Sequence, residues 1–282
     1  MCDEGRLSYR LMNERKTRIN SPLGRVDQNL QDISWEEAYR AIAERIIEMA
    51  PKENEVIALT DTHASNEELF LLKKLLKDGF LSDNVFCPLP KWEQIESEFF
   101  INTLITTDKS PNRAGALALK IKGDAKNVGV KNLIDRKLKM AIILGCPFEK
   151  ENDFQQKIKQ TQLVIHIGAY HNCWSGIADV VLPGQNYSEK KGTFTNKLQQ
   201  VQTTDIAVQA LSRSRPEWQI LAELGQALGY KFDFNNVNQV FGAMSEEIKA
   251  FSGLSFDQIG DKGIKLTKTF NDNGMKLVKE TT

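Results

Sequence analysis

The sequence predicts a doubly wound α/β domain built on a mostly parallel sheet. Four short apolar runs, at residues 56–59, 140–144, 163–167 and 180–182, lack the polar–apolar alternation of a half-exposed strand. Continuous apolar runs bounded by Gly or Pro indicate strands that are buried on both faces, as in a parallel sheet. Residues 101–106 are a further candidate of the same type. Helical segments separate these runs, and strands that alternate with helices are typical of this fold class.

Capping boxes mark the start of two predicted helices. Ser34 to Glu37 and Ser65 to Glu68 each place a serine three residues before a glutamate. In this pattern the two side chains satisfy each other's free backbone donors at a helix N-terminus. Apolar residues at helical spacing follow each box. We expect Pro51 to stop the first helix and Gly79 to terminate the second.

Two further helices are predicted near the end of the chain. One is expected to begin near Pro216 and to end before Gly229. The other carries apolar residues on one face from Val237 to Phe251. Together with the earlier elements, these helices place a single α/β domain at residues 34–260.

The two ends of the chain differ in composition from this domain. Residues 1–33 are polar and rich in Arg and Asn, and we expect an extended lead-in there. Beyond Gly253 the chain becomes rich in Lys and Asp, and residues 261–282 are expected to form a surface tail.

The composition is that of an ordinary globular protein. Of the 282 residues, 41% are hydrophobic and 26% are charged, and 37 Lys and Arg balance 37 Asp and Glu. A net charge of zero gives no electrostatic reason to expect a nucleic acid as partner. No apolar run approaches the roughly 20 residues that a membrane-spanning helix needs. We therefore expect neither a nucleic-acid partner nor a direct membrane span.

The cysteines and the N-terminus indicate a cytoplasmic protein. Residues 1–10 carry four charged side chains, unlike a signal peptide. The four cysteines are widely spaced, at Cys2, Cys87, Cys146 and Cys173. Without a secretory context, reduced thiols are expected rather than a disulfide framework.

Common catalytic motifs are missing from the sequence. It contains no G-x-G-x-x-G, no phosphate-binding G-x-x-x-x-G-K, no H-E-x-x-H and no C-x-x-C. His166 lies inside an apolar run and is interpreted as a core histidine rather than a catalytic one. We expect no self-contained active site in this chain.

A segment near residue 180 combines a buried strand with a glycine-containing continuation. Ala178 to Gly184 reads A-D-V-V-L-P-G, and Glu189 to Asn196 reads E-K-K-G-T-F-T-N. Gly184 and Gly192 allow the backbone to pass close to a neighbouring group. The segment resembles the A-D-V-V-L-P…E-K-x-G-T-[FY]-x-N-x-E-G-R signature of the molybdopterin oxidoreductase superfamily. In pterin-binding relatives, the resemblance implies that this neighbour is the nucleotide end of the cofactor.

The chain departs from this signature at one place. Leu198-Gln199-Gln200 stands where the pattern has E-G-R. The change removes a glycine that permits close backbone approach and an arginine that donates two hydrogen bonds to an anion. We therefore expect no molybdenum cofactor, and no stoichiometric iron, on this chain alone.

Residues 107–116 form a second motif, T-D-K-S-P-N-R-A-G-A. It follows a predicted strand and opens a helix, where free backbone N–H groups bind anions. Lys109 and Arg113 would add positive charge, although a surface turn is the alternative interpretation. The motif resembles the D-K-x-P-N-x-x-G-A of the large subunits of complex I and of related hydrogenases. The resemblance implies remnant cofactor-binding residues at Lys109, Asn112, Arg113, Gly192, Thr193 and Asn196.

Three shorter segments extend the likeness along the chain. Asp32 to Ala38 resembles the S-W-[DE]-E-A start of the first helix in molybdopterin oxidoreductases. Arg215 to Leu221 and Ser252 to Phe256 are similar to R-P-[DE]-W-x-I-L and Y-x-G-[LI]-S-[YF] stretches of the same proteins. The resemblance therefore extends over most of residues 1–260.

The N-terminus resembles the end of an iron–sulphur segment. Met1 to Asn13 is similar to W-M-C-D-x-G-R-x-x-Y-x-x-x-N. The resemblance implies that Cys2 is the fourth ligand of a 4Fe–4S cluster that an upstream segment or chain completes. Cys2 would then lie beside Arg6 and face that partner.

Taken together, the motifs predict a structural or scaffolding subunit of an NADH:quinone oxidoreductase (complex I-like). Its partners would be the other subunits of a respiratory NADH-oxidising complex at the inner face of the cell membrane. Two alternatives remain: a molybdopterin-dependent oxidoreductase of the formate dehydrogenase type, and a subunit of an NAD-linked hydrogenase. A third is a separate anion-binding or assembly module that uses Lys109 and Arg113.

Overall fold

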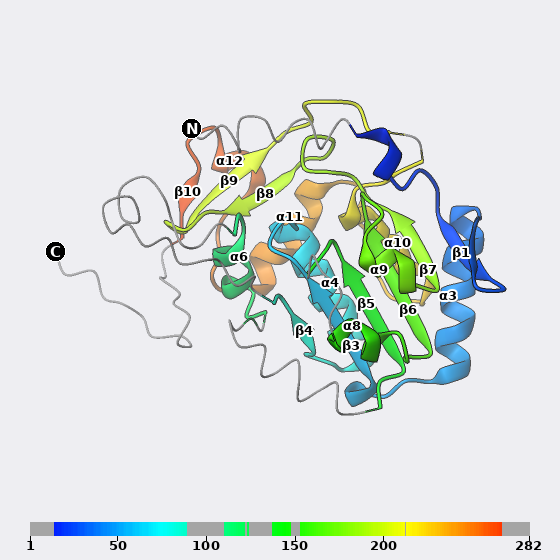
Figure 1. Ribbon diagram of the computed structural model, residues 1–282. Helices are drawn as coiled ribbons and strands as arrows, with labels where there is room; N and C mark the ends of the chain where they lie inside the picture. Colours follow the sequence, from blue (N-terminus) through cyan, green and yellow to red (C-terminus); the bar gives the residue numbers. More distant parts are fainter. Residues whose placement is uncertain are drawn as a thin grey trace, which may run out of the picture.

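A seven-stranded sheet in the order β2-β1-β7-β6-β5-β3-β4 forms the centre of the protein (Figure 1). The computed structural model describes residues 14–88, 110–121, 123, 137–147, 153–211 and 213–266. The strands of this sheet are β1 (Leu23–Val26), β2 (Asn29–Asp32), β3 (Val56–Thr60), β4 (Val85–Phe86), β5 (Met140–Leu144), β6 (Leu163–Gly168) and β7 (Val180–Pro183).

Five neighbouring strands of the sheet, from β4 to β7, run parallel to one another. Val56 is paired with Met140, and Met140 is paired in turn with Leu163. Strand β7 continues the set on β6, with Ile165 opposite Val180. All four apolar runs therefore form parallel strands, which confirms the predicted fold class. The candidate strand at 101–106 lies outside the described residues.

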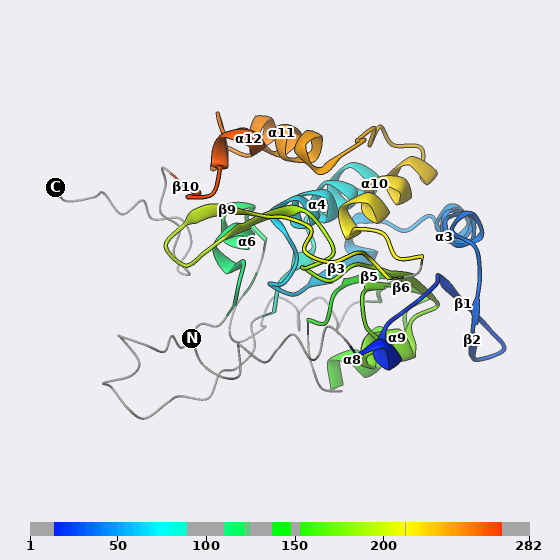
Figure 2. The same ribbon diagram turned by 90° about the horizontal axis from the view of Figure 1, so that it is seen from above.

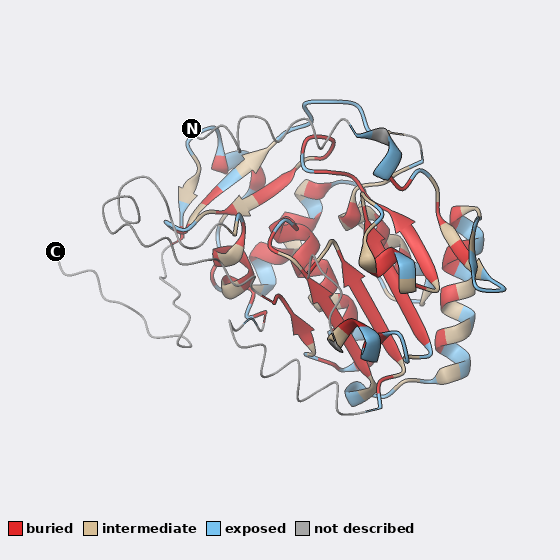
Figure 3. Cartoon of the chain, viewed as in Figure 1, coloured by how far each residue is buried: buried red, intermediate tan, exposed pale blue. Residues whose placement is uncertain are grey.

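Helices cover both faces of the sheet, as the doubly wound fold requires (Figure 2). One face packs on α3 (Trp35–Met49), α4 (Asn66–Phe80), α10 (Glu217–Ala227) and α11 (Val237–Glu247). The other face packs on α8 (Asp153–Ile158) and α9 (Cys173–Ile177). Successive residues of one strand join the two cores alternately, with Ala58 in the first core and Leu59 in the second. The central strands are accordingly buried along their whole length (Figure 3).

The β1–β2 hairpin adds two antiparallel strands to the edge at β7. Leu23 is paired with Val181, and Arg25 N donates to Asp179 O over 2.8 Å. A two-residue turn at Asp27 and Gln28, with φ of 47° and 69°, joins the two strands. The hairpin lies within residues 1–33, where the sequence predicted an extended lead-in. The edge strand β2 is mostly exposed and lacks an apolar pattern, so the sequence gives no periodic signal there.

A second, smaller sheet lies beside the first. Its antiparallel strands are β8 (Gly192–Thr195), β9 (Gln200–Thr204) and β10 (Ile264–Lys265), in the order β10-β9-β8. The short helix α12 (Phe256–Ile259) precedes β10, and α6 (Arg113–Ala118) contacts β8. Leu266 is buried, so the chain remains folded beyond residue 261, where a surface tail was expected. Residues 267–282 lie outside the described part.

The predicted capping boxes are present at both helices. Ser34 caps α3 together with Glu37, and Ser65 caps α4 together with Glu68. The chain leaves α3 at Ala50, directly before Pro51. At the end of α10, Gly229 has a φ of +85°, as expected for a helix terminator. The helix α11 ends at Glu247 rather than near Phe251, although the Phe251 ring is fully buried.

The terminator of α4 differs from the prediction. The helix continues through Gly79, whose α-carbon faces the Tyr230 ring, and it ends at Phe80. Leu81 follows in the left-handed conformation, with φ 55° and ψ 25°. An L-residue thus occupies the position that glycine usually fills, and a Cβ at Gly79 would make only an ordinary contact of 3.4 Å with Tyr230.

Leu81→Gly is therefore expected to raise the stability of the protein. Leu81 is 80% exposed, so little burial is lost, and the left-handed conformation disfavours an L-residue by about 1 kcal/mol. Thermal unfolding should show a midpoint that is higher by a few degrees. Leu81→Ala is the matched control, because it removes the same exposed surface and keeps the strain. An equal gain in both variants would contradict the assignment.

Candidate functional site

A cavity of about 690 Å³ opens at the carboxyl ends of the parallel strands. Its wall includes Asp61 after β3, Leu144 at the end of β5, and Gly168 at the end of β6. Tyr170 and Tyr187 add aromatic surface. In open α/β sheets, ligands bind outside the carboxyl ends of the strands, where the winding of the chain reverses. Here β4 and β5 flank β3 on opposite sides, so this reversal lies between β3 and β5, at the cavity.

Asp61 joins the ends of β3 and β5. Its Oδ2 accepts a hydrogen bond from Cys146 N at 2.7 Å, and its Oδ1 accepts one from His63 N at 2.8 Å. A side chain at Gly145, where φ is +77°, would collide with the Asp61 carboxylate. Burial raises the pKa of Asp61, but hydrogen bonds and the charge of His63 outweigh it and lower the pKa below its ordinary value. The carboxylate is therefore ionised at neutral pH.

A buried lysine and two glutamates form another part of the wall. Lys190 Nζ lies 2.7 Å from Glu68 Oε1 and 2.7 Å from Glu217 Oε2. Burial, together with the charge of Glu68, raises the pKa of Glu217 to about 8 in spite of the nearby ammonium. Burial alone would lower the pKa of Lys190, but the two carboxylates raise it above its ordinary value. The lysine is therefore fully charged and is compensated within the wall.

Two helix N-termini lie at the cavity, and both are closed by their own side chains. At α4, Ser65 N donates to Glu68 Oε2 over 2.9 Å. At α9, Asn172 Oδ1 accepts from Trp174 N at 2.9 Å and from Ser175 N at 3.2 Å. These caps use some of the backbone donors that would bind an anion at an open helix N-terminus.

A second buried ion pair lies behind Tyr170. Arg18 Nη2 is 2.6 Å from Glu189 Oε2, and the two side chains are 0% and 3% exposed. The guanidinium carbon also lies 4.9 Å from the centre of the Tyr170 ring. Arg18 thus connects the N-terminal segment to the wall through charge and through an aromatic face.

Of the predicted cofactor-binding residues, three lie together in a buried polar network away from the cavity wall. Thr193 N donates to Glu67 Oε2 over 2.9 Å, and Thr193 Oγ1 donates to Glu67 Oε1 over 2.8 Å. Asn112 Oδ1 accepts from Thr195 N at 2.7 Å. A Cβ at Gly192 would lie 3.0 Å from the side chain of Ser65. The close approach that glycine permits is to α4 of the same chain, and cofactor contact by these residues stays a prediction.

Asn196 lies in the tight turn between β8 and β9. Its side-chain oxygen accepts from Leu198 N at 2.9 Å and from Gln200 N at 3.1 Å. Gln199, at the glycine of the E-G-R pattern, has a φ of +61°. In this chain the position therefore requires a left-handed conformation, which explains the glycine in the pattern without cofactor approach.

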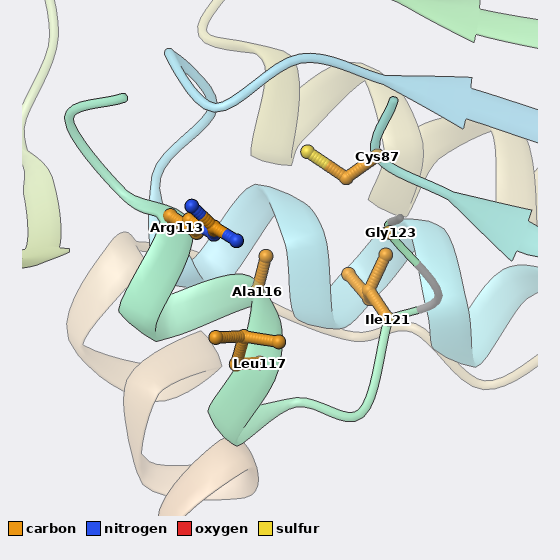
Figure 4. Close-up of a pocket in the computed structure, with 6 residues that line it drawn as sticks. All are labelled: Cys87, Arg113, Ala116, Leu117, Ile121 and Gly123. Atoms are coloured by element: carbon orange, nitrogen blue, oxygen red, sulfur yellow. The ribbon is translucent and has the colours of Figure 1, made fainter. Parts of the chain in front are cut away.

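Arg113 begins α6 beside a small separate cavity of about 10 Å³ (Figure 4). Among the described residues, its wall also contains Cys87 and Ile121. This volume is about that of one water molecule. Burial raises the pKa of the Cys87 thiol above its ordinary value, which makes that thiol unreactive. Lys109 and Cys2 lie outside the described residues, so their predicted roles stay predictions.

His166 is a core residue, as the sequence indicated. It is fully buried, and its Nε2 lies 3.0 Å from Gly145 O. Nδ1 has no hydrogen-bond partner among the described residues. Burial lowers the pKa of His166 to about 4, so the ring is neutral. No sequence motif pointed to Asp61, although a polar residue directly after a buried strand was the signal that could have indicated it.

Glu67 makes the stability of the polar network dependent on pH. Burial raises its pKa from 4.5 to about 7. Between these values the unfolded chain releases a proton that the folded protein retains, so stability falls as the pH rises. Glu67→Gln cannot ionise, and its amide can accept from Thr193 N through the oxygen and donate to Thr193 Oγ1 through the nitrogen. We expect it to match the wild type near pH 4.5 and to be more stable by roughly 2–3 kcal/mol at pH 8.

Urea unfolding of both proteins from pH 4.5 to 8 measures this effect. Glu36→Gln is the matched control, because Glu36 lies in the first turn of α3 as Glu67 does in that of α4, but is exposed. Parallel pH profiles for the wild type and Glu67→Gln would contradict the raised pKa.

The fold and the cavity define the class: a doubly wound α/β protein with a ligand-sized cavity at the topological switch point. Residues 18–90 and 81–227 match the family described as molybdopterin oxidoreductase. The chain belongs to this family.

Curated relatives include alpha subunits of formate dehydrogenases. The chain is 35% identical over 105 residues to the F420-dependent formate dehydrogenase 2 subunit alpha of Methanococcus maripaludis. The matched segment makes up 36% of this chain and 16% of the relative. It is 26% identical over 188 residues to the F420-dependent formate dehydrogenase subunit alpha of Methanocaldococcus jannaschii. This longer match makes up 64% of this chain and 26% of the relative. The match thus spans between a sixth and about a quarter of these relatives.

A solved structure shares the fold. Acetylene hydratase from Pelobacter acetylenicus superposes with a TM-score of 0.55 at 10% identity, covering 92% of this chain and 67% of the other. No described helix is long and apolar enough to cross a membrane. Within the described ranges, no three His, Cys, Asp or Glu side chains are grouped to hold a metal ion.

Proposed function

We propose that this chain is a structural component of an oxidoreductase assembly of the formate dehydrogenase type. In this assembly it supplies the α/β domain with the cavity, and other segments or subunits carry the redox chemistry. The observation that supports the proposal most directly is the likeness to formate dehydrogenase alpha subunits over as many as 188 residues. It favours this function over the complex I-like scaffold that the sequence motifs suggested.

The wall of the cavity is consistent with a structural component. The residues that it brings together are Asp61, His63 and the cluster of Lys190, Glu68 and Glu217. Each carboxylate of this set has a cation or a backbone donor as its partner. A set of paired charges rigidifies a wall but offers no activated nucleophile. We infer that other parts of the assembly carry the electron transfer.

The test is purification of the tagged chain from its own host at natural expression levels. We expect molybdenum and formate-dependent reduction of a viologen dye to copurify with it. Deletion of the gene should remove that activity, and the wild-type gene should restore it. NADH-dependent quinone reduction in the purified assembly would instead support the complex I-like alternative, and hydrogen-dependent reduction of NAD would support the hydrogenase alternative. Either result without formate activity overturns the proposal.

A further inference from the structure

We propose that Asn112 is a positioning residue that clamps the loop at residues 61–65 and thereby fixes one side of the cavity wall. This loop connects β3 to α4, and it contributes Asp61, His63 and Ala64 to the wall. Asn112 is fully buried at the start of α6. It acts on the cavity through hydrogen bonds to the main chain of the loop.

Asn112 binds the loop at two places and the small sheet at a third. Its backbone N donates to Thr62 O over 3.1 Å, and its Nδ2 donates to Ala64 O over 2.8 Å. Its Oδ1 accepts from Thr195 N on β8 at 2.7 Å. The side-chain amide thus joins the loop to β8. Because its partners are backbone atoms, these bonds fix the path of the main chain.

The position of Asn112 on its own helix supports this role. Asn112 is the N-cap of α6, but its side chain makes no capping hydrogen bond to that helix. An asparagine at an N-cap usually accepts from the first turn. Here the amide instead bonds to residues 48 and 83 positions away. Asn112 therefore serves the loop and β8 rather than the start of α6.

Gly115 leaves the space that this arrangement needs. A Cβ at Gly115 would lie 2.3 Å from Asn112 Oδ1 and 2.0 Å from Asn66 Oδ1. Both distances are far below an ordinary contact, so a larger residue would displace the two amides. Asn112 and Gly115 are three positions apart, and residues at this spacing lie on the same side of a helix. The N-x-x-G spacing within residues 107–116 therefore has a role in packing within the chain.

Amide hydrogen exchange of the full chain, followed by NMR, tests the inference. Asn112→Ala removes the donor to Ala64 O, so we expect the His63 and Ser65 amides to exchange about tenfold faster or more. Asn66→Ala is the matched control. The Asn66 side chain is equally buried, but it donates to hydroxyl groups of β8 instead of to a carbonyl of the loop. This variant should change the exchange of the loop by less than about twofold.

Asn112→Asp separates the clamp from a general loss of packing, because the new side chain has nearly the same shape. A protonated carboxyl can donate to Ala64 O as the amide does, whereas an ionised one cannot. Burial raises the pKa of a carboxyl group, so we expect wild-type exchange of the loop near pH 5 and about tenfold faster exchange at pH 8. Each comparison is made with the wild type at the same pH, because both proteins share the ionisable groups of the neighbouring segments: Asp61 and His63 in the loop, Glu67 on α4 and Arg113 on α6.

Gly115→Ala reaches the same clamp without changing Asn112, and it carries the test together with Asn112→Asp if Asn112→Ala fails to fold. Its methyl group should displace the Asn112 amide and speed exchange of the loop about fivefold or more. Gly242→Ala on α11 should leave that exchange unchanged, because a Cβ there meets no atom within 4 Å.

Three results would each overturn the inference. They are unchanged exchange of the loop in Asn112→Ala, an equal acceleration in Asn66→Ala, and a ratio of Asn112→Asp to wild type that is the same at both pH values. The measurement uses the chain alone and needs no ligand. Its result is therefore independent of the assembly test for the proposed function.

Discussion

Replacing Lys190 with methionine is expected to lower the free energy of unfolding by about 3–5 kcal/mol at pH 8. The substitution leaves Glu68 and Glu217 buried without their shared cation, since all three side chains are at most 9% exposed. Buried carboxylates without a partner protonate or destabilise the fold. The loss should therefore be smaller at pH 5, where the two glutamates take up protons more readily. Urea unfolding followed by tryptophan fluorescence measures the difference.

A surface cluster that also joins one lysine to two carboxylates provides the matched control. Lys74 lies 3.1 Å from Asp78 and 2.6 Å from Glu247, and the three side chains are 20–44% exposed. Lys74→Met should cost less than about 1 kcal/mol, because water solvates the remaining carboxylates. Adding Glu68→Gln and Glu217→Gln to Lys190→Met should recover most of the stability, since glutamine still completes the capping box at position 68. A loss below about 1 kcal/mol in Lys190→Met would contradict the role of the buried cluster.

The parts of the fold that the sequence predicted correctly have a strong local signal. Four apolar runs and two capping boxes determined the central strands and the starts of α3 and α4. The family likeness was also visible, because Ala178 to Asn196 carries a specific pattern. Continuous hydrophobicity and helix caps each follow from the chemistry of adjacent residues, so one sequence was sufficient.

The features that were missed depend on contacts between distant residues. The exposed strand β2 has no apolar period, and it is held by pairing with β1, which in turn pairs with β7. The helix α4 continues through Gly79, whose carbonyl oxygen accepts a hydrogen bond from the Tyr230 hydroxyl, 151 positions away, at 3.1 Å. The turn at Gln199 shows the same limitation. Its left-handed φ was not visible in the sequence, so its glycine counterpart was attributed to a cofactor.

The candidate site was the least predictable part of the protein. Asn112, Gly192 and Thr193 do lie close together, as their motif residues implied, but they bind α4 and β8 of the same chain. The cavity instead collects residues that follow three different strands, among them Asp61 and Cys146. Strand order determines which of these residues meet, and the sequence predicted the strands without their order.

Arg18→Met is expected to destabilise the protein by about 3–5 kcal/mol, because it leaves the Glu189 carboxylate buried without its cation. Glu189 Oε2 accepts from Arg18 Nη2 at 2.6 Å and from Asn186 N at 3.0 Å. The loss should appear in urea unfolding at neutral pH. Arg45→Met is the matched control: Arg45 lies 3.3 Å from Asp179, and both side chains are partly exposed. It should cost less than about 1 kcal/mol.

The double variant Arg18→Met with Glu189→Gln separates the ion pair from the packing of the arginine side chain. Two guanidinium nitrogens of Arg18, Nε and Nη1, are buried without hydrogen-bond partners among the described residues. Their desolvation opposes the attraction to Glu189, so the intact pair adds little net stability. Glutamine can still accept the hydrogen bond from Asn186 N without carrying a charge. We therefore expect the double variant to unfold within about 1 kcal/mol of the wild type. If the double variant were as unstable as Arg18→Met alone, the loss would come from the contact of Arg18 with Tyr170 rather than from the unpaired carboxylate.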